Sequence, residues 1–207
     1  MTITNENDEA YANAAFINNS EEIVSEWTKK AEHFRVNKLE SATAELDIPY
    51  GDSNRQKFDI FQPNTKPLGT VIFIHGGYWI DLDKSYWSHF ASGVLANGYR
   101  CVIPSYDLCP TVKISDITGQ IKNLVCYVLE KYDGMISLVG HSAGGHLVSR
   151  MISIDQWNIS KLRSDLLKRL HHVVAISPIA DLRPLLKTSM NNKFHLNQQT
   201  AEKESPV

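Results

Sequence analysis

A pentapeptide in the second half of the chain has the residue types of a serine nucleophile. Gly140-His141-Ser142-Ala143-Gly144 matches the pattern G-x-S-x-G, and the apolar run Met135–Val139 directly precedes it. In this context the serine sits on a sharp turn between a strand and a helix, with small residues on both sides so that neighbouring segments can approach. The first turn of the helix supplies free N–H groups that stabilise negative charge. A glycine turn without catalytic function is the alternative.

A second segment has what acyl transfer requires beside a nucleophile. His75-Gly76-Gly77-Tyr78-Trp79 directly follows the apolar run Val71–Ile74. A tetrahedral oxyanion needs preorganised N–H donors, and glycine lets the backbone turn its amides inward without a Cβ in the way. We therefore expect the backbone N–H groups of Gly76 or Gly77, together with that of Ala143, to form an oxyanion hole.

The other side chains of this loop are open to two interpretations each. We interpret His75 as a side chain that holds the loop by a hydrogen bond, and not as a general base. Tyr78 and Trp79 lie beside the expected oxyanion hole, so they are candidates for an aromatic wall that binds substrate. Packing in the core or in a lid is an equally strong alternative for both, and for Trp79 it includes support of the loop.

Together these segments resemble the kynurenine formamidase (arylformamidase) family of α/β-hydrolases. The HGGxW motif of that family is matched at His75, Gly76, Gly77 and Trp79, and its nucleophile segment is matched by residues 140–147. Residues 106–110 and 181–183 are similar to family segments that follow the fourth and sixth strands. The resemblance extends from about Ala31 to the end of the chain, although HGG and G-x-S-x-G are shared with many esterases.

The resemblance implies a reaction and a substrate. The expected activity is hydrolysis of N-formylkynurenine or a similar aryl formamide to formate and an aryl amine, a step of tryptophan degradation. It implies no organic cofactor and no metal. A formyl group needs little room, whereas the leaving group is a flat ring that Tyr78 and Trp79 could contact. A carboxylesterase that uses Ser142 and the same loop on small esters is the alternative.

The partners of Ser142 are harder to find. A serine needs an imidazole to take its proton and a carboxylate to orient that imidazole. The resemblance implies that Asp and His follow two further strands after residue 207. Asp181 and His195 have the right order, but Asp181 is better explained as a helix cap, and His195 lies in a polar stretch that no strand holds. A catalytically inactive fragment is therefore a third hypothesis.

Four further titratable residues were considered as partners. His146 lies one helical turn after Ser142, which favours a structural or pocket-lining role. His171 and His172 begin a strand, so they belong at the edge of the sheet opposite the active site. Asp107 follows a strand and is interpreted as a loop anchor.

The elements that position these motifs alternate between strand and helix. Such alternation predicts an α/β-hydrolase fold, with a mostly parallel sheet covered by helices on both faces and with the C-terminal strands missing. A sheet edge left open in this way favours pairing with another chain, for example in a homodimer. The predicted strands are 44–48, 57–61, 71–74, 99–104, 135–139 and 172–176, and the predicted helices are 20–34, 87–96, 114–129, 142–154 and 181–186.

Length and composition limit the remaining classes. The 207 residues, 43% of them hydrophobic, suit a polar lead over residues 1–19 and one domain over residues 20–207. A net charge of −2 argues against a nucleic-acid partner. The apolar runs are too short to cross a membrane, and the polar start lacks a signal peptide, so a cytoplasmic protein is expected. Three cysteines without C-x-x-C spacing are expected to be reduced thiols.

Overall fold

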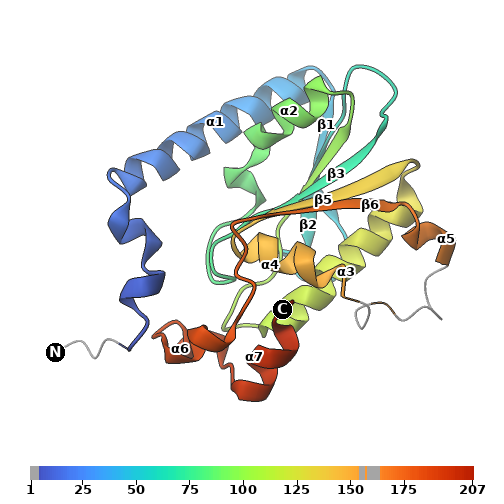
Figure 1. Ribbon diagram of the computed structural model, residues 1–207. Helices are drawn as coiled ribbons and strands as arrows, with labels where there is room; N and C mark the ends of the chain where they lie inside the picture. The colour runs from blue at the N-terminus through green and yellow to red at the C-terminus, as the bar shows by residue number, and fades with distance from the viewer. Residues whose placement is uncertain (1–4, 154–156, 158–163) are drawn as a thin grey trace.

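A six-stranded sheet forms the centre of the computed structural model, which describes residues 5–153, 157 and 164–207 (Figure 1). The strands lie in the order β1-β2-β4-β3-β5-β6. Antiparallel pairing joins β1 to β2 and β2 to β4, whereas β4, β3, β5 and β6 are parallel. The predicted mostly parallel sheet is therefore confirmed. The strand bounds are β1 Ala44–Pro49, β2 Lys57–Phe61, β3 Gly69–Ile74, β4 Arg100–Pro104, β5 Met135–His141 and β6 Leu170–Ile176.

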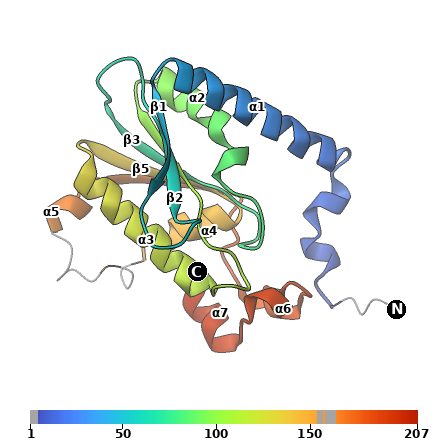
Figure 2. The same ribbon diagram turned by 180° about the vertical axis from the view of Figure 1, so that it is seen from behind.

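Helices cover both faces of this sheet, as predicted. Helices α1 and α2 lie on one face, and α3 and α4 lie on the other (Figures 1 and 2). Short 3-10 turns connect several elements. The helices are α1 Ser20–Glu40, α2 Ala91–Ala96, α3 Ile114–Lys131, α4 Ala143–Arg150, α5 Ser164–Leu167, α6 Asn191–Phe194 and α7 Gln198–Glu204, and the turns are η1 Glu9–Tyr11, η2 Asn13–Phe16, η3 Lys84–Tyr86, η4 Ser88–Phe90 and η6 Arg183–Lys187.

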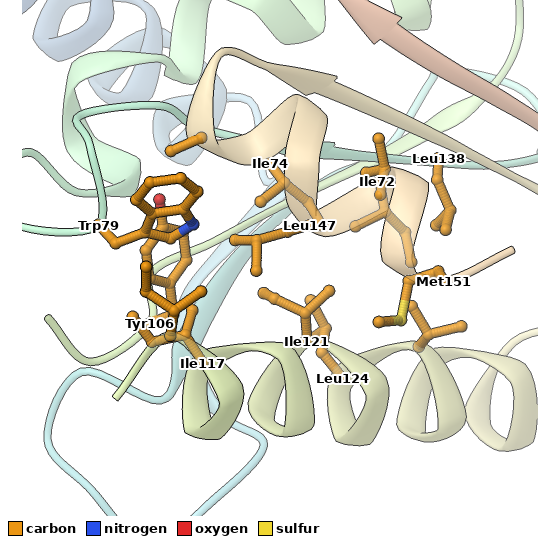
Figure 3. Packing of buried hydrophobic residues seen from close by; sticks show 14 of the residues in the cluster. Ile72, Ile74, Trp79, Tyr106, Ile117, Ile121, Leu124, Leu138, Leu147 and Met151 are labelled. Carbon is orange, nitrogen blue, oxygen red and sulfur yellow. The ribbon is translucent and has the colours of Figure 1, made fainter. Parts of the chain in front are cut away.

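Strand β3 shows why the central strands are apolar without interruption. Successive side chains of a strand point to opposite faces. Phe73 therefore packs with the cluster under α1 and α2, while Ile72 and Ile74 pack with the cluster under α3 and α4. On the second face, Leu147 of α4 lies between the sheet and Ile121 of α3 (Figure 3). Each fully buried side chain of this kind stabilises the fold by about 1.5–3 kcal/mol.

The order of the strands determines where a ligand can bind. From β3 the chain passes through α2 to β4 on one side, and from β4 it passes through α3 to β5 on the other side of β3. In open parallel sheets, such a reversal opens a crevice at the carboxyl ends of the diverging strands. Both predicted motifs leave the sheet there, His75 after β3 and Ser142 after β5.

Several helix boundaries differ from the sequence-based expectations. Helix α1 starts at Ser20 as predicted, but the Asn19 side chain makes no capping hydrogen bond, because Asn19 adopts a left-handed backbone with φ 58°. The single helix predicted over residues 87–96 divides into η4 and α2. The helix after Ser142 ends at Arg150, and the predicted end at residue 154 lies outside the described residues. Residues 183–187 form a 3-10 turn.

The polar C-terminal segment packs against the helix that follows the nucleophile. Glu204 of α7 is 4% exposed, and its carboxylate lies 3.6 Å from Arg150 Nε of α4 and accepts a hydrogen bond of 3.0 Å from the Thr118 hydroxyl of α3. Its carbonyl oxygen accepts a 2.7 Å hydrogen bond from His146 Nε2. The end of the described chain thus ties α7, α3 and α4 together.

No helix in the described ranges has both the length and the apolar character that a bilayer crossing requires.

We expect Glu204→Ala to lower the free energy of unfolding by about 3 kcal/mol, because it leaves Arg150 buried without this carboxylate. Glu204→Gln retains an oxygen that can accept the hydrogen bond from the Thr118 hydroxyl, so its free energy of unfolding should fall less. Glu202→Ala, at an exposed position of the same helix, is the control and should stay within about 0.5 kcal/mol of the wild type. Urea denaturation measures all three, and equal losses for Glu204→Ala and Glu202→Ala would contradict the role of the buried contact.

Candidate active site

Ser142 sits on the sharp turn that the motif predicts. Strand β5 ends at His141, helix α4 begins at Ala143, and Ser142 between them has φ 56° and ψ −117°. This backbone conformation is sparsely populated by residues with a Cβ. Two hydrogen bonds hold it: the Ser142 N–H donates to the carbonyl of Ile176 at 2.9 Å, and the His146 N–H donates to the carbonyl of Ser142 at 3.0 Å.

The two glycines of the motif allow this turn to pack. A Cβ on Gly140 would lie 2.1 Å from the carbonyl oxygen of Gly144, and a Cβ on Gly144 would lie 2.0 Å from the carbonyl oxygen of Ile74. Both neighbours are backbone atoms that cannot move aside. The requirement for small residues on both sides of Ser142 therefore has a steric origin.

The glycine loop after β3 lies directly against the nucleophile turn. A Cβ on Gly76 would lie 3.0 Å from Ser142 Cβ and 2.9 Å from the carbonyl oxygen of His141. In the described part of the chain, the backbone N–H groups of Gly76, Gly77 and Ala143 donate to no backbone or side-chain acceptor. The structure thus brings Gly76 next to the serine that Ala143 follows, whereas a Cβ on Gly77 would meet Asp81 and Leu82. That these amides bind an oxyanion stays a prediction.

His75 holds the loop and is not placed as a base. Its ring is fully buried and stacks on Tyr106 with the ring centroids 4.3 Å apart and an angle of 8° between the planes. His75 Nδ1 donates to the carbonyl of Gly76 at 2.6 Å, and the Tyr106 hydroxyl donates to the carbonyl of His75 at 2.9 Å. Burial lowers the pKa of His75 to about 4, so the ring is neutral near pH 7.

Tyr78 and Trp79 separate into two roles. Tyr78 is half-buried and lines the cavity in front of Ser142. Trp79 is fully buried, with its ring at right angles to His146 and Phe194, at centroid distances of 5.0 and 5.7 Å. The expectation that Trp79 forms a wall for substrate is corrected by this burial. The alternative holds, in which Trp79 supports the loop from below, beside Tyr106 (Figure 3).

The cavity in front of Ser142 has a volume of about 330 Å³. It contains one histidine among the described residues, His141, and burial lowers the pKa of its ring. His141 is not among the residues predicted for the site, although it lies inside the G-x-S-x-G motif. Three residues from the N-terminal lead also line the cavity, and no local sequence pattern predicts this position for them. The lining residues are Ala10, Tyr11, Asn13, Tyr78, His141, Ser142, Ser177, Pro178, Ile179, Ala180, Asp181 and Pro184.

Asp181 and His195 are not brought together at this cavity. Asp181 lines it, but its carboxylate accepts from the Arg183 side chain at 2.8 Å and from the Arg183 N–H at 2.9 Å. These hydrogen bonds hold the pKa of Asp181 at about 2, and they agree with the capping role. His195 is exposed at the end of α6 and lines a separate depression of about 180 Å³ with α3 and α7.

The other titratable residues also lie away from the Ser142 hydroxyl. His146 is fully buried and structural, and His171 and His172 are exposed at the start of β6. Asp107 anchors its loop as predicted, because it accepts hydrogen bonds from Ser53 at 2.7 Å and from Gln120 at 2.9 Å. Within residues 5–153, 157 and 164–207, no imidazole is hydrogen-bonded to Ser142 Oγ.

The cysteines offer no alternative nucleophile. All three thiols are free. Burial raises the pKa of Cys101 to about 12 and that of Cys109 to about 11, so both remain protonated at neutral pH. Among the described residues, no group of three or more His, Cys, Asp or Glu side chains is arranged to hold a metal ion.

Comparisons with known proteins find one matching family and several relatives. The sequence profile of the BD-FAE family matches residues 58–205. Kynurenine formamidase from Salmo salar is 30% identical over 165 residues, which are 78% of this chain and 54% of that protein. The enzyme of the same name from Danio rerio is 29% identical, over 78% of this chain and 55% of that protein. The chain therefore spans about half the length of the curated relatives it matches.

Solved structures extend the comparison to the fold. The crystal structure of a candidate thioesterase from Silicibacter sp. TM1040 superposes with a TM-score of 0.90 at 46% identity, and the match covers 97% of this chain and 74% of that one. Esterase B from Lactobacillus rhamnosis superposes with a TM-score of 0.59 at 20% identity, over 79% of this chain and 60% of that one. The second match shows the α/β-hydrolase fold alone.

Replacing Ser142 should reveal the strain of its turn. Glycine adopts positive φ without a steric penalty, whereas alanine keeps the Cβ. We therefore expect the free energy of unfolding of Ser142→Gly to be about 1 kcal/mol higher than that of Ser142→Ala. Urea denaturation of the two variants measures the difference. Equal stability would mean that the surrounding contacts do not force Ser142 into a strained backbone.

Buried His146, which contacts Glu204 of α7, should make the free energy of unfolding depend on pH. Burial lowers the pKa of His146 from 6.5 to about 4, so between these values the unfolded chain binds a proton that the folded chain does not. Stability should be constant with respect to this group above pH 6.5 and should fall by up to about 1.4 kcal/mol per pH unit below it. His75 should add a similar dependence of the free energy of unfolding on pH, because burial lowers its pKa in the same way.

His146→Gln is the variant that isolates this effect. Glutamine keeps an N–H that can donate to the carbonyl of Glu204 but does not titrate. Urea denaturation at several values between pH 4.5 and 7.5 should therefore give a shallower loss of stability for the variant than for the wild type. Parallel curves would contradict a buried neutral His146.

Proposed function

The chain belongs to the BD-FAE family of α/β-hydrolases, and from this membership we propose that it is a serine hydrolase of the arylformamidase type. Its substrates are aryl formamides similar to N-formylkynurenine, and its products are formate and an aryl amine. The observation that carries the proposal is the position of Ser142: it lies on a strained turn against the glycine loop and opens into the cavity that Tyr78 lines.

The proposed reaction proceeds by acyl transfer. Ser142 Oγ attacks the formyl carbon, its proton passes to a histidine, and the amides of Gly76, Gly77 and Ala143 hold the oxyanion. The tetrahedral intermediate collapses, the C–N bond breaks, and the histidine protonates the departing aryl amine. Water then attacks the formyl-serine and gives one proton to the histidine. The bond between Ser142 Oγ and the formyl carbon breaks, the histidine returns that proton to Ser142, and the formic acid released ionises to formate in solution.

The histidine of this mechanism is part of the proposal. The family pattern places it, with its aspartate, after two strands that follow the nucleophile strand by some distance. Curated relatives named kynurenine formamidase are nearly twice as long as the matched segment. Their names support the formamide substrate. The compact cavity, at the lower end of the usual range for ligand sites, suits a substrate with one ring.

Ester or thioester hydrolysis is the second candidate. The 46% identity to a candidate thioesterase over 97% of the chain favours it. The chemistry also discriminates between the two: an aryl amine needs a proton from an acid as it leaves, whereas a nitrophenolate or a thiolate leaves unprotonated. Activity on a p-nitrophenyl ester or a thioester that far exceeds activity on an aryl formamide would therefore favour the esterase and would indicate that no general acid acts on the leaving group.

A fluorophosphonate probe tests the nucleophile without knowledge of the substrate. The wild-type chain should be labelled at Ser142, as located by peptide mass spectrometry, and Ser142→Ala should lose labelling and at least about 10³-fold in turnover. Ser149→Ala removes another serine from the same helix and should behave as the wild type. Folded wild-type protein that is never labelled would establish the third hypothesis, an inactive protein.

A further inference from the structure

The N-terminal lead is docked against the body of the molecule. Residues 9–11 and 13–16 form η1 and η2, and the segment lies beside α6 in both views (Figures 1 and 2). None of the residues in these two turns is buried. Tyr11 is half-buried and packs against the hydrophobic cluster under α3 and α4, and the remaining contacts of the segment described below are polar.

Asp8 makes the central contact of this docking. Its carboxylate accepts the backbone N–H of Ser189 at 2.6 Å and also the Ser189 hydroxyl. On one side of it, the Asn7 N–H donates to the carbonyl of Lys187 at 3.0 Å, and the Asn7 side chain donates to the carbonyl of Pro184 at 2.8 Å. These bonds attach the lead to the segment that begins with η6.

The inner side of the lead forms part of the cavity in front of Ser142. Ala10, Tyr11 and Asn13 line the cavity. The hydroxyl of Tyr78, which directly follows Gly77, donates to the carbonyl of Tyr11 at 3.0 Å. The lead therefore spans the cavity from the oxyanion loop, at Tyr78, to the segment after β6, at Pro184.

We propose that residues 5–16 form a strap that limits the size of the substrate at Ser142, with Asp8 as its latch and Asn13 as a residue that sets the width of the cavity. The proposal rests on the proposed function, because it requires Ser142 to be the nucleophile. A segment held by a few surface hydrogen bonds and one half-buried tyrosine, without fully buried side chains, opens at a lower free energy than the sheet unfolds. Release of the latch should thus widen the cavity and leave the sheet folded.

The test compares the labelling rates of two fluorophosphonates, one with a methyl substituent and one with a biphenylmethyl substituent. The measured quantity is the bulky-to-small rate ratio on the full chain. Asp8→Ala and Asn13→Ala should raise this ratio by about 10-fold, and Asn13→Trp should lower it by about 10-fold, as expected for a change in pocket size. Glu9→Ala changes an exposed residue of the same turn η1 and should keep the wild-type ratio.

Stability measurements complete the test. The urea midpoint of Asp8→Ala should equal that of the wild type, and a clearly lower midpoint would overturn the strap as a separable element. A ratio that stays the same in Asp8→Ala, Asn13→Ala and Asn13→Trp would overturn the role in substrate size while leaving Ser142 as the nucleophile. Wild-type protein that neither probe labels would instead overturn the proposed function, and the strap's role with it.

Discussion

The close approach of backbone to backbone at the carboxyl ends of β3 and β5 is the constraint on which the rest of the site depends. Gly144 packs against the carbonyl of Ile74, and Gly76 packs against Ser142, with no room for an additional methyl group at either contact. This packing places free amides next to a serine hydroxyl. Preorganised dipoles of this kind are commonly the largest contribution to acyl-transfer catalysis, because they need no reorientation when charge develops.

The surrounding elements can be understood as supports of that contact. Strand β6 accepts the Ser142 N–H, the buried His75 ties down the glycine loop, and Trp79 fills the space between that loop and α4. On the far side of α4, Glu204 connects the helix to α3 and α7. The nucleophile is therefore held by segments that lie between 34 residues (Ile176) and 67 residues (His75) away from it in the sequence, as a strained turn requires.

In the proposed reaction, the nucleophile and the glycine loop contact only the carbonyl group, which formamides, esters and thioesters share. Selectivity in that reaction would depend on the rest of the cavity, where residues 177–184 and the lead lie beside Tyr78 and His141 of the two motifs. Residues 177–184 and the lead lie outside both motifs, so they can change while the reaction centre stays the same.

The sequence by itself determined the parts that follow from local sterics and from periodicity. Glycines around Ser142 predict a tight turn because no other residue fits it, and apolar runs predict strands buried on both faces, as found for β3. Strand β5 is buried on one face and only half-buried on the other. Only the tertiary structure decided which distant surfaces meet: that Trp79 points into the core, that Glu204 is buried under α4, that Asp181 and His195 stay apart, and that the polar lead borders the cavity. Such contacts depend on how whole elements dock, and polar side chains on a surface carry no periodic signal for their partner.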